Sequence, residues 1–334
     1  MRIFITGGAG FIGSHLAEHL LERGDSVLAL DDLSTGSMEN INHLTGHPGY
    51  EYRIGSALDA ALVTELVDQC DLTVHLAAAV GVQLIVERPV HTIETNVGAT
   101  EVVLRASMKK RKLVMLASTS EVYGKSTDLP FREDQDLQLG PTTHSRWAYA
   151  CSKALDEWLG LAYAREHRLP VIILRFFNTV GPRQTGRYGM VIPSFAAQAV
   201  RGEPITVFGD GTQSRCFGHV KDTVEGIVRL MEIPGAVNEV FNIGATEEVT
   251  IGQLAETVRA EARSHSPIIH VPYSEAYGEG FEDMHRRVPD VSKLERVTGF
   301  RPQTPLKAIV ADVVDDQRHR FTRAGGSRPS QTGR

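Results

Sequence analysis

A glycine-rich turn near the start of the chain constrains the fold more than any other feature. The sequence Thr-Gly-Gly-Ala-Gly-Phe-Ile-Gly occupies residues 6–13, directly after an apolar run. A strand that turns into a helix in this way brings backbone amides and the positive end of the helix dipole to a pyrophosphate. Gly7 permits the turn, Gly10 lets the backbone approach the phosphates, and Gly13 lets the helix pack on the sheet. The segment therefore predicts a dinucleotide site.

The acid that follows selects the dinucleotide. Asp31 ends the second apolar run, 18 residues after Gly13. A carboxylate at this position accepts hydrogen bonds from the adenosine ribose and repels a 2′-phosphate. The sequence thus predicts NAD rather than NADP as the cofactor.

Apolar runs and helical patterns alternate through the first half of the chain. Strands are expected at residues 3–6, 27–30, 72–76, 113–117 and 171–174, with helical spacing at residues 13–23 and 96–109 between them. This alternation predicts an α/β fold with a doubly wound parallel (Rossmann) sheet and a smaller C-terminal α/β domain for the substrate. The predicted division gives residues 1–176 and a returning segment of about 216–245 to the dinucleotide domain, residues 177–215 and 246–324 to the substrate domain, and residues 325–334 to a disordered tail.

Composition excludes several other classes of protein. The net charge is −6 over 334 residues and the 35 basic residues are scattered, so no nucleic-acid footprint is expected. There is no apolar run of the ~20 residues that a membrane span needs. Three cysteines without close spacing predict neither a disulfide framework nor a metal site, and favour a cytoplasmic setting.

A second group of residues points to proton chemistry. Tyr149 and Lys153 stand four residues apart in a helical stretch, so their side chains share one face. A phenol titrates near pH ~10, but a neighbouring ammonium favours the phenolate, which makes Tyr149 the predicted base and Lys153 its tuning cation. Thr119 and Glu121 follow the strand at residues 113–117, at the sheet edge where such folds bind ligands.

Together, the glycine turn, Thr119, Tyr149 and Lys153 resemble the extended short-chain dehydrogenase/reductase superfamily, and within it the NAD-dependent nucleotide-sugar epimerases, dehydratases and decarboxylases. Further matches lie at residues 75–78, 96–100, 175–182 and 286–290. The resemblance implies that Tyr149 takes a proton from the sugar 4-hydroxyl while hydride passes from C4 to NAD, giving a 4-keto sugar.

The resemblance also implies two sets of binding residues. Those expected to contact NAD are Gly7, Gly10, Phe11, Ile12, Gly13, Asp31, Asp32, Ser34, Thr35, Gly36, Ser56, Ala57, Leu76, Ala77, Ala78, Asn96, Tyr149, Lys153 and Phe176. Those expected to contact a UDP-sugar are Val80, Thr119, Asn178, Arg187, Val191, Thr206, Phe208, Arg215, Arg287 and Asp290. Within the second set, Asn178 is expected at the diphosphate, Thr206 and Phe208 at uracil, and Arg215, Arg287 and Asp290 at phosphate and ribose. Arg187 is expected to meet a hexuronate carboxylate.

The fate of the 4-keto sugar separates the members of this family. The expected activity is a UDP-sugar 4-epimerase acting on UDP-glucuronate/UDP-galacturonate or UDP-glucose/UDP-galactose, because Ala-Cys-Ser between Tyr149 and Lys153 is typical of epimerases. Thr-Ser-Glu at residues 119–121 and Arg-Arg-Val-Pro-Asp at 286–290 resemble UDP-glucuronate decarboxylases, which are the alternative. Dehydration ranks last, because Ser120 stands where dehydratases carry an aspartate.

The resemblance also implies a homodimer, formed through the helices at residues 96–109 and 149–165. A non-catalytic dinucleotide-binding sensor is the alternative from another class, but such a protein has no reason to keep Thr119, Tyr149 and Lys153 together.

Overall fold

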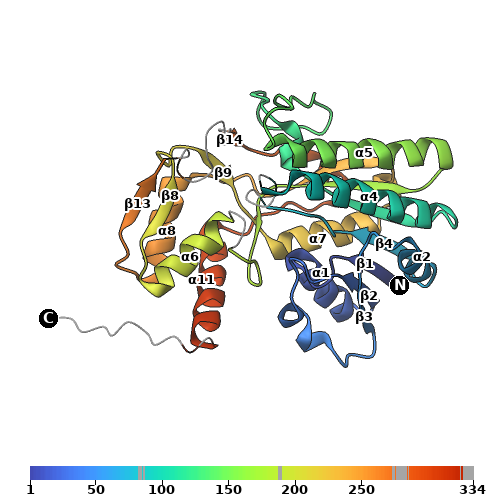
Figure 1. Ribbon diagram of the computed structural model, residues 1–334, viewed down its shortest axis with the longest axis horizontal. Helices are drawn as coiled ribbons and strands as arrows, with labels where there is room; N and C mark the ends of the chain where they lie inside the picture. Colours follow the sequence, from blue (N-terminus) through green and yellow to red (C-terminus); the bar gives the residue numbers. More distant parts are fainter. Residues whose placement is uncertain are drawn as a thin grey trace.

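The computed structural model describes residues 1–81, 85, 87–186, 190–272, 275, 284, 286–323 and 325. Across these residues seven parallel strands form one sheet in the order β11-β6-β5-β4-β1-β2-β3 (Figure 1). Their bounds are β1 Arg2–Thr6, β2 Ser26–Asp31, β3 Tyr50–Ile54, β4 Leu72–His75, β5 Leu113–Thr119, β6 Val171–Phe176 and β11 Glu239–Ile243. The order reverses between β1 and β4, which places the glycine turn at the point where such sheets bind nucleotides.

Helices cover both faces of this sheet, as the alternation of apolar side chains along the strands requires. On one face Ile3 and Ile5 pack with α1 (Phe11–Glu22), α7 (Val220–Met231) and α10 (Ser292–Thr298). On the other face Phe4 packs with α2 (Ala60–Asp68), α4 (Pro89–Met108) and α5 (Trp147–His167). The predicted doubly wound α/β fold is therefore confirmed.

A second group of elements lies beyond the carboxyl ends of the strands (Figure 1). It contains α6 (Val191–Arg201), α8 (Ile251–Ala262), α11 (Leu306–Arg323) and the parallel pair of β8 (Ile205–Phe208) and β13 (Ile268–Val271), around a separate apolar cluster. Shorter strands join it to the sheet: β7 Thr179–Val180, β9 Ser214–Cys216, β10 Gly218–His219, β12 Glu248–Thr250 and β14 Arg286–Arg287. The domain boundaries given above stay a prediction.

The apolar pattern of the sequence did not predict strand β3 of the main sheet. Strand β3 lies at the edge of the sheet and pairs with β2 from Val27↔Tyr50 to Asp31↔Ile54. Only Tyr50 is buried, and the next four residues are exposed, so the strand shows no apolar run. Apolar runs reveal strands that are covered on both faces, and this edge strand is not.

The structure also bears on membrane spans, metal ligands and cysteines. Within the described residues no helix is both long and apolar enough to cross a bilayer, and no group of metal-ligating side chains is found. Cys70, Cys151 and Cys216 are all free thiols. The cytoplasmic setting stays a prediction, and the predicted tail, apart from Gly325, lies outside the described residues.

Candidate active site

The glycine turn is shaped by close contacts between backbone atoms. Gly7 has φ +72° and donates its N–H to the Leu30 carbonyl at 2.8 Å. A Cβ atom on Gly13 would lie 2.1 Å from the Gly7 carbonyl oxygen, and one on Gly10 would lie 3.0 Å from it. Helix α1 begins at Phe11, so its free amides face this turn. Glycine is required for the turn to close so tightly, and the turn lies where a pyrophosphate is expected.

Asp31 fixes the glycine turn to the loop that follows β2. Its Oδ2 accepts the Ala9 N–H at 2.9 Å, and its Oδ1 accepts the Leu33 N–H at 2.8 Å. Burial raises the pKa of Asp31, and these backbone hydrogen bonds oppose the rise. A Cβ on Gly36 would lie 2.7 Å from Asp31 Oδ1. The carboxylate therefore braces the turn as well as lying where a ribose is expected.

The remaining residues expected at NAD are spread over the carboxyl ends of the strands. The Leu76 N–H donates to the Thr6 carbonyl at 3.1 Å and the Ala77 N–H to Thr6 Oγ1 at 3.2 Å, which fixes the segment that also contains Ala78. Phe176 is the strand partner of Thr119. Asp32 Oδ1 accepts the Ser34 N–H at 2.9 Å, Ser56 Oγ accepts the Leu58 N–H at 3.2 Å, and Ile12, Thr35 and Ala57 lie in the adjoining turns or helix.

Asn96 joins two of these segments to the helix that carries the predicted base. Its Oδ1 accepts the Ala79 N–H at 2.8 Å, and its Nδ2 donates to Ser152 Oγ at 3.1 Å. Ser152 in turn donates to the Tyr149 carbonyl at 2.9 Å. Asn96, on helix α4, therefore links the segment at Ala79 to helix α5.

Thr119 and Tyr149 come together as expected. Tyr149 is 7% exposed and shares a hydrogen bond with the Thr119 side chain. Burial raises the pKa of Tyr149, the charges of Glu121 and Asp156 raise it further, and Thr119 and Arg146 oppose the rise. Lys153 Nζ lies 2.7 Å from Asp156 Oδ2 in a buried ion pair, and its expected effect on Tyr149 stays a prediction.

Glu121 lies between two arginines. Arg146 Nη1 donates to its Oε2, and Arg287 Nη1 lies 3.6 Å from its Oε1. The three side chains are 3%, 11% and 12% exposed for Arg146, Glu121 and Arg287, so water screens these charges poorly. Arg146 was missed by the sequence reading, although a basic residue at the start of the helix that carries Tyr149 was visible.

Two predicted phosphate-binding arginines are strand neighbours. Strand β14 runs parallel to β9, with Arg287 opposite Arg215 and Arg286 opposite Ser214. Because side chains alternate along a strand, each pair shares one face of the small sheet. Arg286 and Ser214 both bond Glu248 on one face, so Arg215 and Arg287 share the other face.

Several predicted sugar-nucleotide residues have partners within the protein. Asn178, at φ +31°, donates Nδ2 to the Cys216 carbonyl at 2.9 Å. Thr206 Oγ1 accepts from Gln198 at 3.3 Å, and the Phe208 carbonyl accepts from Gln213 at 2.9 Å. Val80 and Val191 are half-buried. Arg187 lies outside the described residues.

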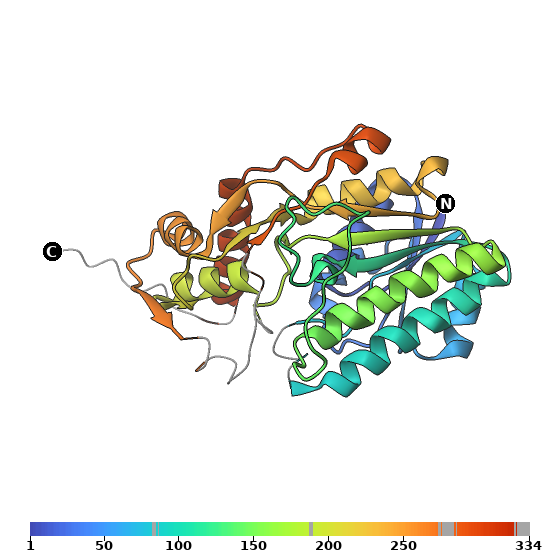
Figure 2. The ribbon, with the colours of Figure 1, turned by 90° about the horizontal axis from the view of Figure 1, so that it is seen from above.

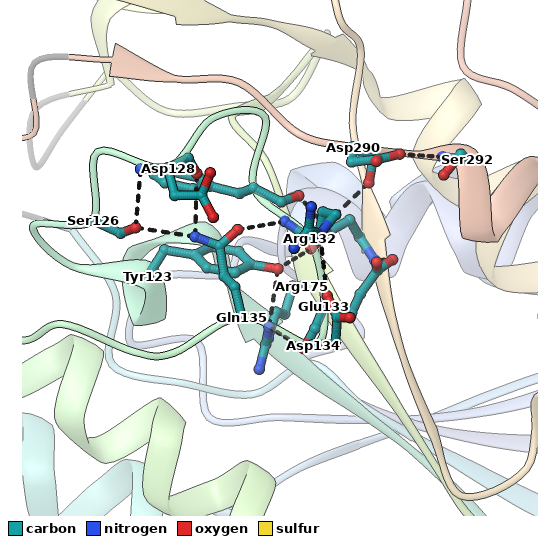
Figure 3. A network of polar contacts seen from close by, with 12 residues as sticks. Tyr123, Ser126, Asp128, Arg132, Glu133, Asp134, Gln135, Arg175, Asp290 and Ser292 are labelled. Atoms are coloured by element: carbon teal, nitrogen blue, oxygen red, sulfur yellow. Dashed lines mark hydrogen bonds and ion pairs between the residues drawn. The ribbon is translucent and has the colours of Figure 1, made fainter.

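Asp290 lies just before α10, and its expected contact with a ribose stays a prediction. Its Oδ1 accepts the Ser292 N–H at 2.8 Å, and hydrogen bonds from the Ser292 side chain and backbone lower the pKa of Asp290 (Figure 3). Its backbone is held by Phe131 and Asn242. The carboxylate therefore closes a local turn, a use that its place in the motif did not reveal.

The loop at residues 125–138 connects that turn to the sheet (Figure 3). Arg175 Nη1, from the end of β6, donates to the Tyr123 hydroxyl at 2.9 Å and to the Glu133 carbonyl at 3.3 Å. Phe131 donates its N–H to the Val288 carbonyl at 2.8 Å. The segment that carries Arg287 is thus fixed to the main sheet through this loop.

Comparison with known proteins places this geometry in a family. The sequence profile of the NAD dependent epimerase/dehydratase family matches residues 3–244. The chain belongs to this family. It is 45% identical, over 90% of its length and 92% of the relative's, to a UDP-N-acetyl-alpha-D-glucosaminuronate decarboxylase of Bacillus cytotoxicus. It is 38% identical to UDP-glucuronic acid decarboxylase 6 of Arabidopsis thaliana, over 96% and 90%.

Solved structures give the same fold. The UDP-glucuronic acid 4-epimerase from Bacillus cereus, determined with UDP-glucuronic acid and NAD, matches with a TM-score of 0.87 at 26% identity, covering 96% of this chain and all of that one. The predicted family and the predicted cofactor, NAD, are therefore confirmed, and the chain is an enzyme of this NAD-dependent family.

Proposed function

We propose that this enzyme is an NAD-dependent decarboxylase of a UDP-hexuronate. The observation that supports this proposal is the buried cluster of Glu121, Arg146 and Arg287 beside Tyr149 and Thr119. Of the three charges two are positive and one is negative, so the cluster favours an anionic group over a neutral hydroxymethyl group. A sugar carboxylate is the anion that distinguishes a hexuronate from a hexose.

The relatives favour loss of that carboxylate over its retention. The decarboxylases reported above share 45% and 38% identity with this chain, whereas the 4-epimerase of known structure shares 26%. The Thr-Ser-Glu and Arg-Arg-Val-Pro-Asp motifs point the same way. The epimerase expectation rested on Ala-Cys-Ser between Tyr149 and Lys153, and it becomes the second candidate.

The residues have defined tasks in this reaction. Bound NAD supplies the acceptor for hydride from C4 of the sugar and later its donor. Tyr149, hydrogen-bonded to Thr119, takes the proton of the 4-hydroxyl and returns it at the end. Once C4 is a ketone, the C5–C6 bond breaks, carbon dioxide leaves, and the bonding electron pair moves to the C4 oxygen beside Tyr149 and Thr119.

The remaining steps balance the reaction. C5 takes up one proton from solvent, C4 is reduced, and a UDP-pentose is released. Arg146 and Arg287, with Glu121 between them, hold the site around the carboxylate, and Arg215, on the same face of the small sheet as Arg287, binds the diphosphate. Neither Glu121 nor an arginine is required as the acid, because the ketone itself accepts the electron pair.

The test compares substrates that differ at C6 and C2. The purified enzyme with NAD is incubated separately with UDP-glucuronate, UDP-N-acetylglucosaminuronate and UDP-glucose, and evolved carbon dioxide and sugar products are followed. We expect carbon dioxide and a UDP-pentose from a uronate, and no change in UDP-glucose. A 4-epimer with no carbon dioxide would reject decarboxylation and support the second candidate. Tyr149→Phe should abolish turnover, whereas Tyr163→Phe, on the same helix, should not.

The exposed face of two helices supports a homodimer as a second proposal. Helices α4 and α5 lie side by side on the outside of the molecule (Figure 2). They carry the exposed apolar residues Val90, Ile93, Leu155 and Trp158, of which Trp158 is 61% exposed. Exposed apolar side chains on two neighbouring helices suit contact with a second copy of the chain. Sedimentation should give a dimer for the native chain and a monomer for Trp158→Asp.

A further inference from the structure

A buried ion pair lies one helical turn beyond the predicted base. Lys153 Nζ and Asp156 Oδ2 are 2.7 Å apart on α5, and their side chains are 3% and 2% exposed. Two groups at positions i and i+3 of a surface helix meet often and with little effect. Here both charges are shielded from water, so each determines where the other can lie.

A chain of buried polar side chains lies beside Asp156. Burial raises the pKa of Asp156, and Lys153 and Thr100 of α4 oppose the rise, while the Thr100 hydroxyl lies 3.3 Å from His75 Nε2. His75 Nδ1 lies 2.7 Å from Thr6 Oγ1, at the end of the strand that leads into the glycine turn. Burial, and secondarily the charge of Lys153, lowers the pKa of His75 to about 3, so the imidazole is neutral. Among the described residues Asp156 Oδ1 has no hydrogen-bond partner, so the contact that holds the carboxylate is the one between Oδ2 and Lys153.

The other charged groups near Asp156 and Tyr149 already have partners. Glu157 bonds Arg175 and Ser118, facing β5 and β6. Glu121 and Arg146 pair with each other. Lys153, one helical turn from Tyr149, is therefore the charge whose position can alter Tyr149, and its ammonium contacts Asp156.

We propose that Asp156 is a positioning residue that restrains Lys153, so that the ammonium is divided between Asp156 and Tyr149. The inference rests on the proposed roles of Tyr149 and Lys153 and does not depend on which sugar is the substrate. By holding part of that charge, the carboxylate opposes ionisation of Tyr149 in the NAD-bound enzyme. Asp156 would then set how readily the base becomes available.

The test measures the phenolate of Tyr149 directly. The ultraviolet absorbance of phenolate is recorded with NAD bound at one alkaline pH, and the spectrum of the matching Tyr149→Phe protein is subtracted. Asp156→Asn should raise the phenolate fraction about tenfold, because removing a nearby like charge and freeing a cation both lower the pKa of a phenol by about one or more. Asp156→Glu, which keeps the carboxylate, should stay within about twofold of the native value.

Controls separate restraint of Lys153 from other effects. Asp315→Asn removes an exposed carboxylate at the same i, i+3 spacing from Arg318 on α11 and should change nothing. In a Lys153→Met background, Asp156→Asn should raise the phenolate fraction much less than in the native background, since removing the like charge still favours the phenolate but there is no ammonium to free. An unchanged or smaller phenolate fraction in Asp156→Asn, or the same tenfold rise in the Lys153→Met background, overturns the proposal. Asp156→Ser is measured in the same way if Asp156→Asn does not fold. These readings need no sugar, so a failure of the decarboxylase assay leaves them interpretable.

Discussion

The cofactor end and the sugar end of the site are built in opposite ways. At the cofactor end, Gly7, Gly10 and Gly13 leave room for phosphate by lacking side chains, and the backbone supplies the donors. At the sugar end, Glu121 and Arg146 meet Arg287 from a segment far along the chain, and buried charged side chains define the site. The cofactor end should therefore be disrupted by adding a side-chain atom to a glycine, and the sugar end by removing a buried charge.

Removing one buried charge at the sugar end should have the largest effect. Arg146→Met leaves Glu121 with Arg287 at 3.6 Å, and breaking a buried pair costs about 3–5 kcal/mol. Urea unfolding should show this loss of stability, and carbon dioxide release should fall with it. Exposed Arg132 pairs with Asp134, so Arg132→Met should cost under about 0.5 kcal/mol. Adding Glu121→Gln to Arg146→Met should restore part of the stability; failure to do so would mean that the pair is not the cause.

Adding one methyl group at the cofactor end should come next. Gly13→Ala puts a Cβ 2.1 Å from the Gly7 carbonyl oxygen, and overpacking against backbone costs about 1–3 kcal/mol. Displacing the start of α1 should weaken NAD binding by about 100-fold or more, measured by calorimetry. Gly235→Ala, whose Cβ meets only Ile233 at 4.0 Å, is the matched control. Normal NAD affinity in Gly13→Ala would show that the turn does not hold the pyrophosphate.

The free energy of unfolding should depend on pH through His75, which lies near the cofactor end. His75 has its pKa lowered to about 3, chiefly by burial, whereas in the unfolded chain the imidazole pKa has its ordinary value of 6.5. The folded state is therefore favoured above pH 6.5, and stability falls as the pH drops toward 3, by about 1.4 kcal/mol per pH unit. Urea unfolding between pH 7 and 5 should show this slope, and His75→Gln should flatten it. An equal slope in both proteins would assign it to other groups.

The smallest effect should come from the exposed face of the β9–β14 pair. Hydrogen bonds from Arg286, and next from Ser214, lower the pKa of Glu248 to about 2. This contribution to stability is present above the unfolded value of 4.5 and is lost as the pH falls toward 2. Because the pair is exposed, Glu248→Gln should cost less than about 1 kcal/mol at neutral pH and leave carbon dioxide release unchanged. A large loss of turnover would mean that both faces of the small sheet serve the site.

The contrast between the two ends also explains what the sequence could predict. The glycine turn, Asp31 and the buried strands are local patterns, so the fold class and cofactor followed from short stretches of sequence. Thr119 and Tyr149 were likewise placed together by their motifs. Strand β3 escaped because its exposed residues give no apolar run.

Contacts between distant segments were not predictable in this way. Arg146 joins Glu121 and Arg287 only after the chain has folded, and nothing in one sequence links these positions. Asp156 follows Lys153 by three residues, outside the matched motif, and an acid at this spacing is typical of any exposed helix. Burial, which only the structure reveals, turned that ordinary pair into a restraint. Asp290 illustrates the converse, since a motif position proved to close a turn.

The late position of Arg287 in the chain bears on how the protein is made. The strands that frame the glycine turn are complete by residue 75, whereas β14 reaches the site through Phe131 only after synthesis of Arg287. A ribosome adding about 5–20 residues per second needs roughly 10–40 s for the intervening length. During that interval the nascent chain already contains the glycine turn and still lacks the segment that carries Arg287. The proposed sugar site is therefore completed later in synthesis than the proposed cofactor site.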